Sequence, residues 1–443
     1  MILGLYSLVL WCIQPLMMRK LRRRAQAEPG YGVAPRERLG EYGGAATQPG
    51  EQVVWVHAVS LGETIACAAL VAELRALLPG MRLLLTHGTA TGRTQGASLL
   101  QTGDVQVWQP WDTPAAVKKF LVHFKPVVGL LIETEIWPNL VAQSRAFGVP
   151  LCLVNARLSE KSWLQAQRLA WLARPAYRGL RAVWAQAPAD AQRLAALGAP
   201  VQGVLGNFKF DARPDTDKLA QGNLWRAALG RPVISFVISR EGEEALFLAV
   251  LKHKQAEAQL EYAQVAPNLV ANVQWMIVPR HPQRFDEVAD LCAAYGFKVS
   301  RRSHWGSAGP TLDGGGETAA STLWMGDSLG EMPLYYGLSD VALLGGSFAP
   351  LGGQNLIEAA ACSCPVVMGP HTFNFAQAAE LAVLAGAAWQ VSDMAAAVNK
   401  ALQLVQNPVQ QQAAATAAGR LVSAHQGAAR RTAQAVQALL QNP

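Results

Sequence analysis

Short apolar runs alternate with longer mixed segments along most of this chain of 443 residues. A strand buried on both faces needs no polar alternation, so such runs predict the strands of a parallel sheet. They lie at residues 52–58, 82–86, 105–112, 127–132, 150–154, 182–186, 202–205, 232–238, 274–278, 322–325, 340–344 and 366–368. Most of the segments between them are long enough for a helix. The pattern therefore predicts an α/β protein built of repeated strand–helix units.

The chain begins with an apolar stretch. Residues 1–18 carry no charged side chain, and Arg19, Lys20 and Arg22 to Arg24 follow directly. About twenty apolar residues span a bilayer, and basic residues after such a segment favour the cytoplasm. We expect residues 1–24 to form a single membrane anchor whose basic end attracts an anionic membrane surface. A helix that lies in the membrane interface is the close alternative.

Changes in composition divide the rest of the chain. We expect a first Rossmann-like domain over residues 25–206 and a second over residues 232–392. Proline and glycine interrupt the pattern between them, which predicts a linker at 207–231. Residues 393–443 are rich in Ala and Gln and predict helices that pack back toward the first domain.

The stretch from residue 343 to residue 375 organises the second domain. An apolar run ends on one glycine pair, a second pair follows, and Asn355 then stands where a helix N-cap is expected. Such a loop can present backbone N–H groups to a phosphate. Glu358, one turn into the helix, can accept hydrogen bonds from a ribose. An ordinary glycine-rich loop with a capping Asn explains the local pattern equally well.

Other charged residues also follow predicted strands, at the edge where open α/β sheets bind ligands. Glu63 and Glu133 do so in the first domain, and Lys209 lies near the expected linker. In the second domain Arg280 suits a phosphate or carboxylate, and Glu331 opens a helix. Structural roles explain some of these residues equally well. Glu63 is also explained as an acid in the first turn of a helix, and Lys209 as a surface cation.

Composition limits the classes of binding partner that we expect. The formal net charge is +7 and only 16% of residues are charged. Basic residues are not interleaved with aromatic ones, and no zinc-finger spacing occurs, so we expect no nucleic acid. The six cysteines are scattered without a C-x-x-C motif, which predicts reduced, cytoplasmic thiols. Asp215 and Asp217 form a D-x-D motif in the expected linker, with no strand before it. We expect neither a metal nor a cofactor.

Six separated motifs resemble those of the Kdo transferases. These bacterial enzymes move 3-deoxy-D-manno-octulosonic acid (Kdo) from its CMP-activated form onto a lipid A precursor. The motifs are HAVSLGE (57–63), ETEIWP (133–138), NARLSEKS (155–162), GNFKFD (206–211), GDSLGE (326–331) and the glycine-rich stretch at 345–375. Gln354 departs from the family, which usually has His there. The resemblance covers nearly the whole chain.

The resemblance implies a GT-B fold, with two Rossmann-like domains facing a cleft, and roles for particular residues. Glu63 corresponds to the catalytic base, Glu133 to the acid that supports the transition state, and Lys209 to a stabilising cation. The first domain would receive the acceptor and the second the donor. The implied donor-binding residues are Pro279, Arg280, Leu329, Gly330, Glu331, Asn355, Leu356, Ile357 and Glu358.

The sequence therefore predicts an inverting Kdo transferase of lipopolysaccharide core biosynthesis. CMP-Kdo is its donor and a lipid A precursor (lipid IVA) its acceptor. Its catalytic domains lie on the cytoplasmic face of the inner membrane. Two alternatives stay open: a membrane-associated GT-B enzyme with a UDP-sugar donor, and a non-catalytic, membrane-tethered scaffold. The motifs are the same whether one or several Kdo residues are transferred.

Overall fold

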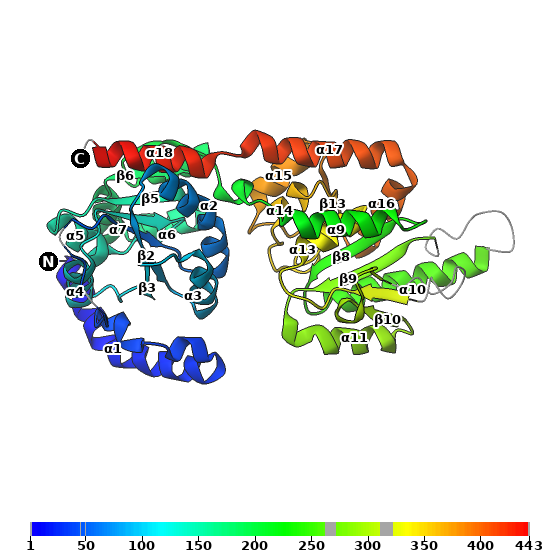
Figure 1. The fold of residues 1–443 in the computed structure, drawn as a ribbon, viewed down its shortest axis with the longest axis horizontal. Helices are drawn as coiled ribbons and strands as arrows, with labels where there is room; N and C mark the ends of the chain where they lie inside the picture. Colours follow the sequence, from blue (N-terminus) through cyan, green and yellow to red (C-terminus); the bar gives the residue numbers. More distant parts are fainter. Residues whose placement is uncertain (1, 45, 49, 262–271, 311–321, 442–443) are drawn as a thin grey trace. The chain divides into compact units, whose positions relative to one another are not determined.

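The computed structural model describes residues 2–44, 46–48, 50–261, 272–310 and 322–441 (Figure 1). The chain forms two compact units. The first comprises Met1–Ala212 together with His425–Pro443, and the second comprises Arg213–Ala424.

The first unit contains a seven-stranded, all-parallel sheet of order β3-β2-β1-β4-β5-β6-β7. Its strands are β1 (Val53–His57), β2 (Arg82–His87), β3 (Val105–Trp108), β4 (Val128–Ile132), β5 (Leu151–Ala156), β6 (Ala182–Ala185) and β7 (Val201–Val204). The winding reverses between the neighbours β1 and β4. Loops at such a switch point part on opposite sides of the sheet and leave room for a ligand.

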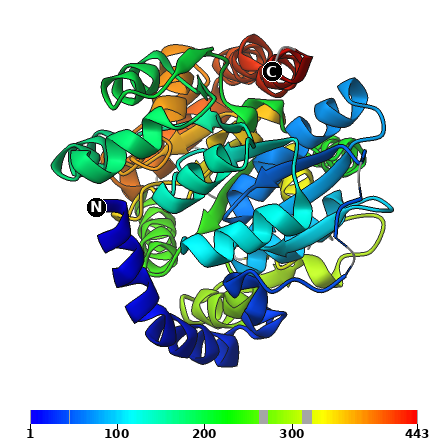
Figure 2. The same cartoon turned by 90° about the vertical axis from the view of Figure 1, so that its left-hand side faces the viewer.

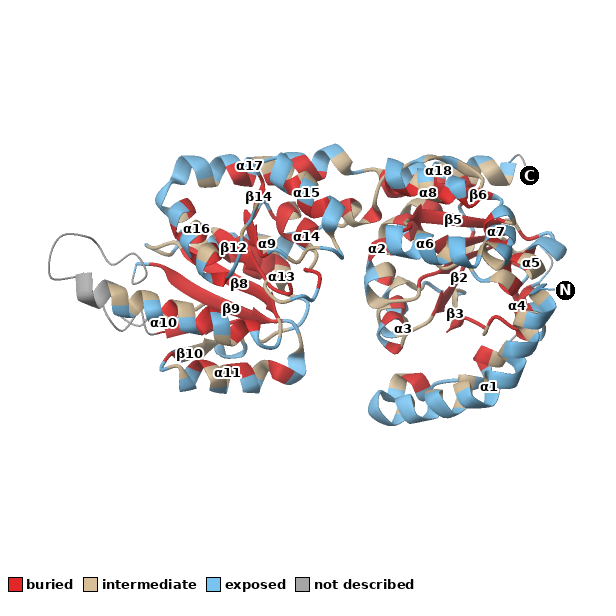
Figure 3. Ribbon diagram, turned by 180° about the vertical axis from the view of Figure 1, so that it is seen from behind, coloured by how far each residue is buried: buried red, intermediate tan, exposed pale blue. Residues whose placement is uncertain are grey.

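Helices cover both faces of this sheet. They are α2 (Leu61–Leu77), α3 (Ala90–Gly96), α4 (Pro114–Phe124), α5 (Pro138–Ala146), α6 (Glu160–Arg168), α7 (Ala170–Arg178), α8 (Pro188–Ala196) and α18 (Ala428–Gln441), with 3-10 turns η1 (Pro29–Gly32), η2 (Pro35–Leu39), η3 (Ala97–Leu99) and η4 (Phe208–Asp211). One core includes side chains of α2 and α18, and the other includes side chains of α4, α5 and α8. The strands are buried throughout most of the sheet (Figure 3).

The second unit also contains a seven-stranded parallel sheet, of order β10-β11-β9-β8-β12-β13-β14. The strands are β8 (Val233–Ser239), β9 (Gln274–Pro279), β10 (Lys298–Arg301), β11 (Thr322–Met325), β12 (Val341–Leu344), β13 (Val366–Met368) and β14 (Ala388–Gln390). Here the winding reverses between β8 and β12. The glycine-rich loop follows β12, so it lies at that switch point.

Helices also flank the sheet of the second unit. They are α9 (Thr216–Ala227), α10 (Glu243–Glu261), α11 (Phe285–Ala294), α13 (Met332–Leu338), α14 (Leu356–Ala361), α15 (Ala376–Leu384), α16 (Met394–Gln406) and α17 (Pro408–His425), with 3-10 turns η5 (Pro282–Arg284) and η6 (Arg302–His304). Side chains of α10, α11 and α16 share one core with β8, β9 and β12.

The predicted fold class is confirmed, since both units have the doubly wound parallel sheet of a Rossmann-like GT-B protein. The units divide the chain elsewhere than at the expected boundaries. Much of the expected linker is α9, which packs on α13 of the second unit. Of the C-terminal helices, α16 and α17 belong to the second unit and only α18 returns to the first. α16 stays with the second unit because its apolar side chains complete the core of the second sheet.

The N-terminal segment forms one long helix, α1 (Ile2–Ala27), that lies along the outside of the first unit (Figures 1 and 2). None of its described residues is buried. Length and composition would allow this helix to cross a membrane.

Candidate active site

Glu63 is held at the start of α2, directly after β1. Its carboxylate accepts hydrogen bonds from Val59 N at 2.9 Å and from the hydroxyl of Ser60 at 2.8 Å. The Ser60 hydroxyl oxygen in turn accepts from Glu63 N at 3.3 Å. This arrangement is a variant of the capping box that the Ser-x-x-Glu spacing signals, because Glu63 accepts from the N–H group one residue before the N-cap Ser60. It fixes the direction of the Glu63 side chain at the carboxyl edge of the sheet.

Burial raises the pKa of the Glu63 carboxyl from 4.5 to about 7. Hydrogen bonds from Val59 and Ser60 oppose this shift, while the negative charges of Glu133 and Glu135 add to it. Three carboxylates from two neighbouring strand ends therefore influence one another. A carboxyl group with a pKa near neutrality is suited to exchange a proton with a substrate.

Glu133 and Lys209 form an ion pair at this edge. Lys209 Nζ lies 3.3 Å from Glu133 Oε1, and both side chains are largely shielded from solvent. Glu133 has a φ of 62°, in the left-handed region that a non-glycine residue seldom adopts. Strained backbone of this kind concentrates at functional sites. The fold therefore brings two of the residues singled out by the sequence into contact.

A network of amides positions Lys209. The side-chain oxygen of Asn155, at the end of β5, accepts from Phe208 N at 3.1 Å. Asn207 donates to the side-chain oxygen of Gln186 at 3.1 Å, and its own oxygen accepts from Lys209 N at 3.0 Å. Because these amides bridge β5, β6 and η4, they fix the backbone of Lys209 against the sheet.

The C-terminal helix supports the same segment. Asp211, two residues after Lys209, accepts hydrogen bonds from Gly427 N and from Ala429 N, the latter at 2.7 Å. The Arg431 guanidinium donates to the carbonyl oxygen of Leu205 at 2.8 Å. The first turn of α18 therefore clamps both ends of the GNFKFD motif.

Glu135 has a different setting. Its carboxylate accepts from Trp137 Nε1 at 2.9 Å, and burial raises its pKa. Pro138 begins α5, as the sequence predicted for a proline in a first helical turn.

In the second unit, Glu243 organises the glycine-rich loop. Its carboxylate is fully buried and accepts from Gly346 N at 2.7 Å, Phe348 N at 3.0 Å and Ala349 N at 3.1 Å. These N–H groups belong to the second glycine of the first pair and to two residues that follow it in the glycine-rich loop. Of the two explanations that the local pattern allowed, the phosphate site does not apply to these three N–H groups, because an internal carboxylate already takes them. The sequence signal for this role was the pair of consecutive acids, Glu243 and Glu244, that follows the buried strand β8.

Arg280 and Glu358 share one part of the second unit. Burial raises the pKa of Glu358, and the positive charge of Arg280 opposes the shift. Arg280 is exposed directly after β9, whereas Glu358 is partly buried in α14. The Tyr336 hydroxyl, within electrostatic reach of both, is buried and has no hydrogen-bond partner among the described residues. Tyr336 was not foreseen, since its position in an apolar helix gave no signal.

The other residues around α14 contribute through their backbone. Asn355 is the N-cap, as predicted, and its side-chain oxygen accepts from Ile357 N at 3.3 Å. Leu356, Ile357 and Pro279 are buried. Only their main-chain atoms are therefore suited to meet a polar ligand. Gln354 packs over Gly346, where its amide nitrogen would lie 3.0 Å from an added Cβ atom.

The GDSLGE motif forms an exposed turn before α13. Leu329 is 73% exposed, and the carbonyl oxygen of Gly330 accepts from Lys218 Nζ at 3.0 Å. Glu331 pairs with the Arg302 guanidinium at 2.9 Å and also accepts from the Ser328 hydroxyl. Glu331 is therefore held in place before any ligand arrives.

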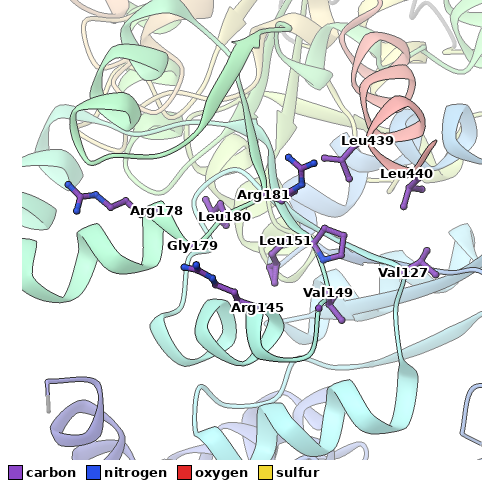
Figure 4. A pocket seen from close by; sticks show the side chains of 12 residues that line it. Val127, Arg145, Val149, Leu151, Arg178, Gly179, Leu180, Arg181, Leu439 and Leu440 are labelled. Carbon is purple, nitrogen blue, oxygen red and sulfur yellow. The ribbon is translucent and has the colours of Figure 1, made fainter. Parts of the chain in front are cut away.

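In the part of the chain that the structure describes, these residues form no metal-binding cluster, and a separate cavity lies away from them. Within the described ranges, no group of three His, Cys, Asp or Glu side chains is placed to hold a metal ion. Asp215 caps α9 and pairs with Lys218. A cavity of about 560 Å³ opens at the amino ends of β4, β5 and β6, where Arg145, Arg178 and Arg181 surround apolar side chains (Figure 4). It lies at the opposite edge of the sheet from Glu63 and Glu133.

Comparison with known proteins identifies the family. Residues 34–212 match the family model of 3-deoxy-D-manno-octulosonic-acid transferase (kdotransferase). The chain is 44% identical to the 3-deoxy-D-manno-octulosonic acid transferase of Bordetella pertussis, over 98% of both chains. The chain belongs to the Kdo transferase family. A Haemophilus influenzae Kdo transferase is 31% identical over 90% of both chains.

Solved structures agree on the fold. A UDP-GlcNAc 2-epimerase from Neisseria meningitidis superimposes with a TM-score of 0.55 at 14% identity, over 88% of this chain and 100% of the other. A glycosyltransferase from Rickettsia africae gives 0.54 at 12% identity, over 88% of this chain and 99% of the other. Identities this low show the GT-B fold alone. Membership of the Kdo transferase family makes the chain a Kdo-transferring glycosyltransferase, as the motifs predicted.

Proposed function

We propose that this Kdo transferase moves Kdo from CMP-Kdo to a hydroxyl group of a lipid A precursor, in lipopolysaccharide core biosynthesis, with inversion at the anomeric carbon. The observation that carries the proposal is the Glu63 carboxyl at the end of β1, whose pKa is raised to about 7. We infer the transferred sugar from the activity of the relatives, and we infer the mechanism from the side chains of this chain.

In the proposed step, Glu63 takes the proton of the acceptor hydroxyl. The acceptor oxygen forms a bond to the anomeric carbon of Kdo while the bond from that carbon to the CMP phosphate breaks. CMP leaves with the bonding electron pair. One displacement of this kind inverts the anomeric centre.

Lys209 and Glu133 act together in this proposal. Lys209 supplies positive charge where negative charge develops, and Glu133 holds the ammonium group at 3.3 Å. Charges fixed before the reaction lower the barrier because they need not reorganise during it. The Asn155 and Asn207 contacts serve this preorganisation.

The second unit binds the donor. In this proposal Arg280 binds an anionic group of CMP-Kdo, and Glu358 accepts hydrogen bonds from the ribose. Asn355 and Leu356 offer backbone groups at the first turn of α14, where the Asn355 side chain already holds the N–H group of Ile357. Leu329, Gly330 and Glu331 contribute from the turn before α13. Pro279 sets the direction of the chain into Arg280. Cationic side chains take the place of a metal in this scheme, so we propose that neither a metal nor a cofactor is required.

We also propose that the enzyme works at the cytoplasmic face of the inner membrane. The apolar, largely exposed helix α1 and the basic cluster that ends it support this location. An acceptor that resides in a membrane requires an enzyme held at its surface.

The test is a transfer assay with purified full-length protein, CMP-Kdo and a lipid A precursor in mixed micelles. Mass spectrometry should show the acceptor mass increased by one or more Kdo units, and NMR of the product should show inversion. CMP should compete with the donor, whereas UDP should not. Absence of any transfer, or inhibition by UDP alone, would overturn the proposed donor.

A further inference from the structure

The long helix α1 has two different faces along its length. The residues that are partly covered recur at a spacing of three and four: Leu3, Tyr6, Ser7, Leu10, Gln14, Met17, Met18, Leu21 and Ala25. The apolar residues that remain exposed lie between them: Ile2, Leu5, Leu8, Val9, Trp11, Ile13 and Leu16. Their exposed fractions run from 36% for Ile13 to 67% for Trp11. One stripe is therefore covered by the protein and the other is not.

Polar contacts attach the first two turns of α1 to the first unit. The Ser7 hydroxyl donates to the side-chain oxygen of Asn139 at 3.0 Å. The Tyr6 hydroxyl hydrogen-bonds to the carboxylate of Asp112, which is buried and also accepts from the N–H groups of Asn139 and Leu140. These partners lie at the first turn of α5 and immediately before α4.

The beginning of α1 also lies beside α5 and α7. Ile2 and Leu3 line a cavity of about 550 Å³ together with side chains of α5 and α7, among them Val141 and Trp171. The beginning of α1 is therefore seated against the protein.

The other end of α1 is attached independently. Leu21 and Ala25 pack on a small core formed by Tyr31, Ala90 and Trp108. The Arg24 guanidinium stacks over the Tyr31 ring at 4.1 Å. Both ends of one helix are thus docked on the same unit.

We propose that α1 lies in the plane of the membrane surface and does not cross the bilayer. This inference rests on the membrane association that forms part of the proposed function. Length alone does not decide, because 26 residues give about 39 Å, enough to span. The contacts of α1 with the first unit favour the in-plane orientation over the spanning one. A spanning α1 would have to leave Asn139 and Asp112 and would carry Tyr6, Ser7 and Gln14 into hydrocarbon, where polar groups need partners.

Charge identifies the surface that the exposed stripe meets. Arg19, Lys20, Arg22 and Arg23 are exposed, and no salt bridge engages any of them within the described part of the chain. In an in-plane helix these side chains reach anionic headgroups while the apolar stripe of the preceding turns enters the interface. The occupant of the exposed face of α1 is therefore a lipid surface that carries negative charge.

The test uses the position of the chain's cysteines. Cys12 is exposed on α1, whereas the other five cysteines are buried. In a Cys12→Ser background, single variants Ile2→Cys and Leu16→Cys are labelled with a nitrobenzoxadiazole probe. The full-length protein is then bound to closed vesicles of phosphatidylethanolamine and phosphatidylglycerol. Dithionite, which does not cross the bilayer, is added from outside.

An in-plane helix leaves both probes in the outer leaflet. Dithionite should therefore lower the fluorescence of each probe by more than 90%, about tenfold. A spanning helix would place the two positions about 21 Å apart in depth and would protect the probe at residue 2 until detergent is added. Protection at residue 2 would overturn the in-plane inference while membrane association stands. Failure of the protein to bind vesicles would overturn both proposals.

A cross-linking pair tests the docking itself. On vesicles, Ser7→Cys with Asn139→Cys should be joined by a short bifunctional maleimide, because these side chains touch. Leu8→Cys with Asn139→Cys is the matched control, since Leu8 lies on the exposed stripe. Equal yields from the two pairs, or none from either, would contradict a docked α1.

Discussion

Lys209 and Glu133 meet at 3.3 Å although 76 residues separate them in the sequence, because β4 ends beside the segment that follows β7 and α18 clamps that segment from behind. The pair brings together two motifs whose connection the sequence left open. It lies in the same electrostatic environment as Glu63, whose pKa Glu133 helps to raise.

Glu63→Gln should lower kcat by about 10²–10⁴-fold, the usual contribution of general-base catalysis. The amide keeps the volume of the side chain but takes no proton. CMP binding should persist, since the donor residues lie in the other unit. Steady-state kinetics and calorimetric titration with CMP measure both. Glu135→Gln is the control and should retain most activity, because that carboxylate accepts from Trp137. Near-normal kcat in folded Glu63→Gln would move the base elsewhere, with Glu133 next in line.

The kcat/KM of the wild-type enzyme should rise with pH through about 7, because Glu63 must lose its proton to act as a base. Stability should change in the opposite sense. Folding raises the Glu63 pKa from 4.5 to about 7, so across that window the folded state holds a proton that the unfolded state has released. Glu63 therefore contributes a loss of stability as pH rises from 4.5 to 7. Urea denaturation at several pH values should show that Glu63→Gln lacks this component.

Glu133→Gln and Lys209→Met should each reduce kcat, and the double variant should lose less than the product of the two factors. Residues in contact typically show coupling energies of about 0.5–3 kcal/mol. The measurement is a double-mutant cycle on kcat/KM. Arg36→Met with Glu41→Gln is the comparison cycle, since that ion pair is exposed and lies outside the proposed site. Independent effects of Glu133 and Lys209 would contradict a shared role.

Glu358→Ala should raise the KM for CMP-Kdo about ten- to a hundred-fold, as expected for loss of a charge-assisted hydrogen bond worth ~1.5–3 kcal/mol. The KM for the lipid acceptor should hardly change. Glu380→Ala, an exposed acid on the neighbouring α15, serves as the control. An unchanged donor KM in folded Glu358→Ala would place the ribose site elsewhere.

Glu243→Gln should disturb the glycine-rich loop without touching the first unit. An amide oxygen replaces a buried carboxylate that accepts from three loop N–H groups, and hydrogen bonds to charged groups contribute about 1.5–3 kcal/mol each at most. We expect a lower melting temperature and a higher KM for CMP-Kdo. Glu241→Gln is the matched control, because the Glu241 side chain is 69% exposed. A fully stable Glu243→Gln with normal donor KM would show that the loop keeps its shape without this carboxylate.

The sequence by itself determined the class of fold and the order of its parts. Short apolar runs without alternation favour strands buried on both faces, so local pattern predicted two parallel sheets. Asn355 as an N-cap and Pro138 in a first turn followed in the same way, because capping depends on neighbouring residues. Six short motifs were enough to predict the Kdo transferase family, which the comparisons confirmed.

Tertiary structure alone decided what those residues contact. The partner of Lys209, the burial that shifts the Glu63 pKa and the occupation of the loop N–H groups by Glu243 all depend on strands that are distant in sequence. The same holds for α16 and α1, whose composition predicted helices but not the surface each one covers. Hydrophobic pattern records which residues are buried. Which side chains then face one another depends on strand order and helix docking, and no local spacing encodes these.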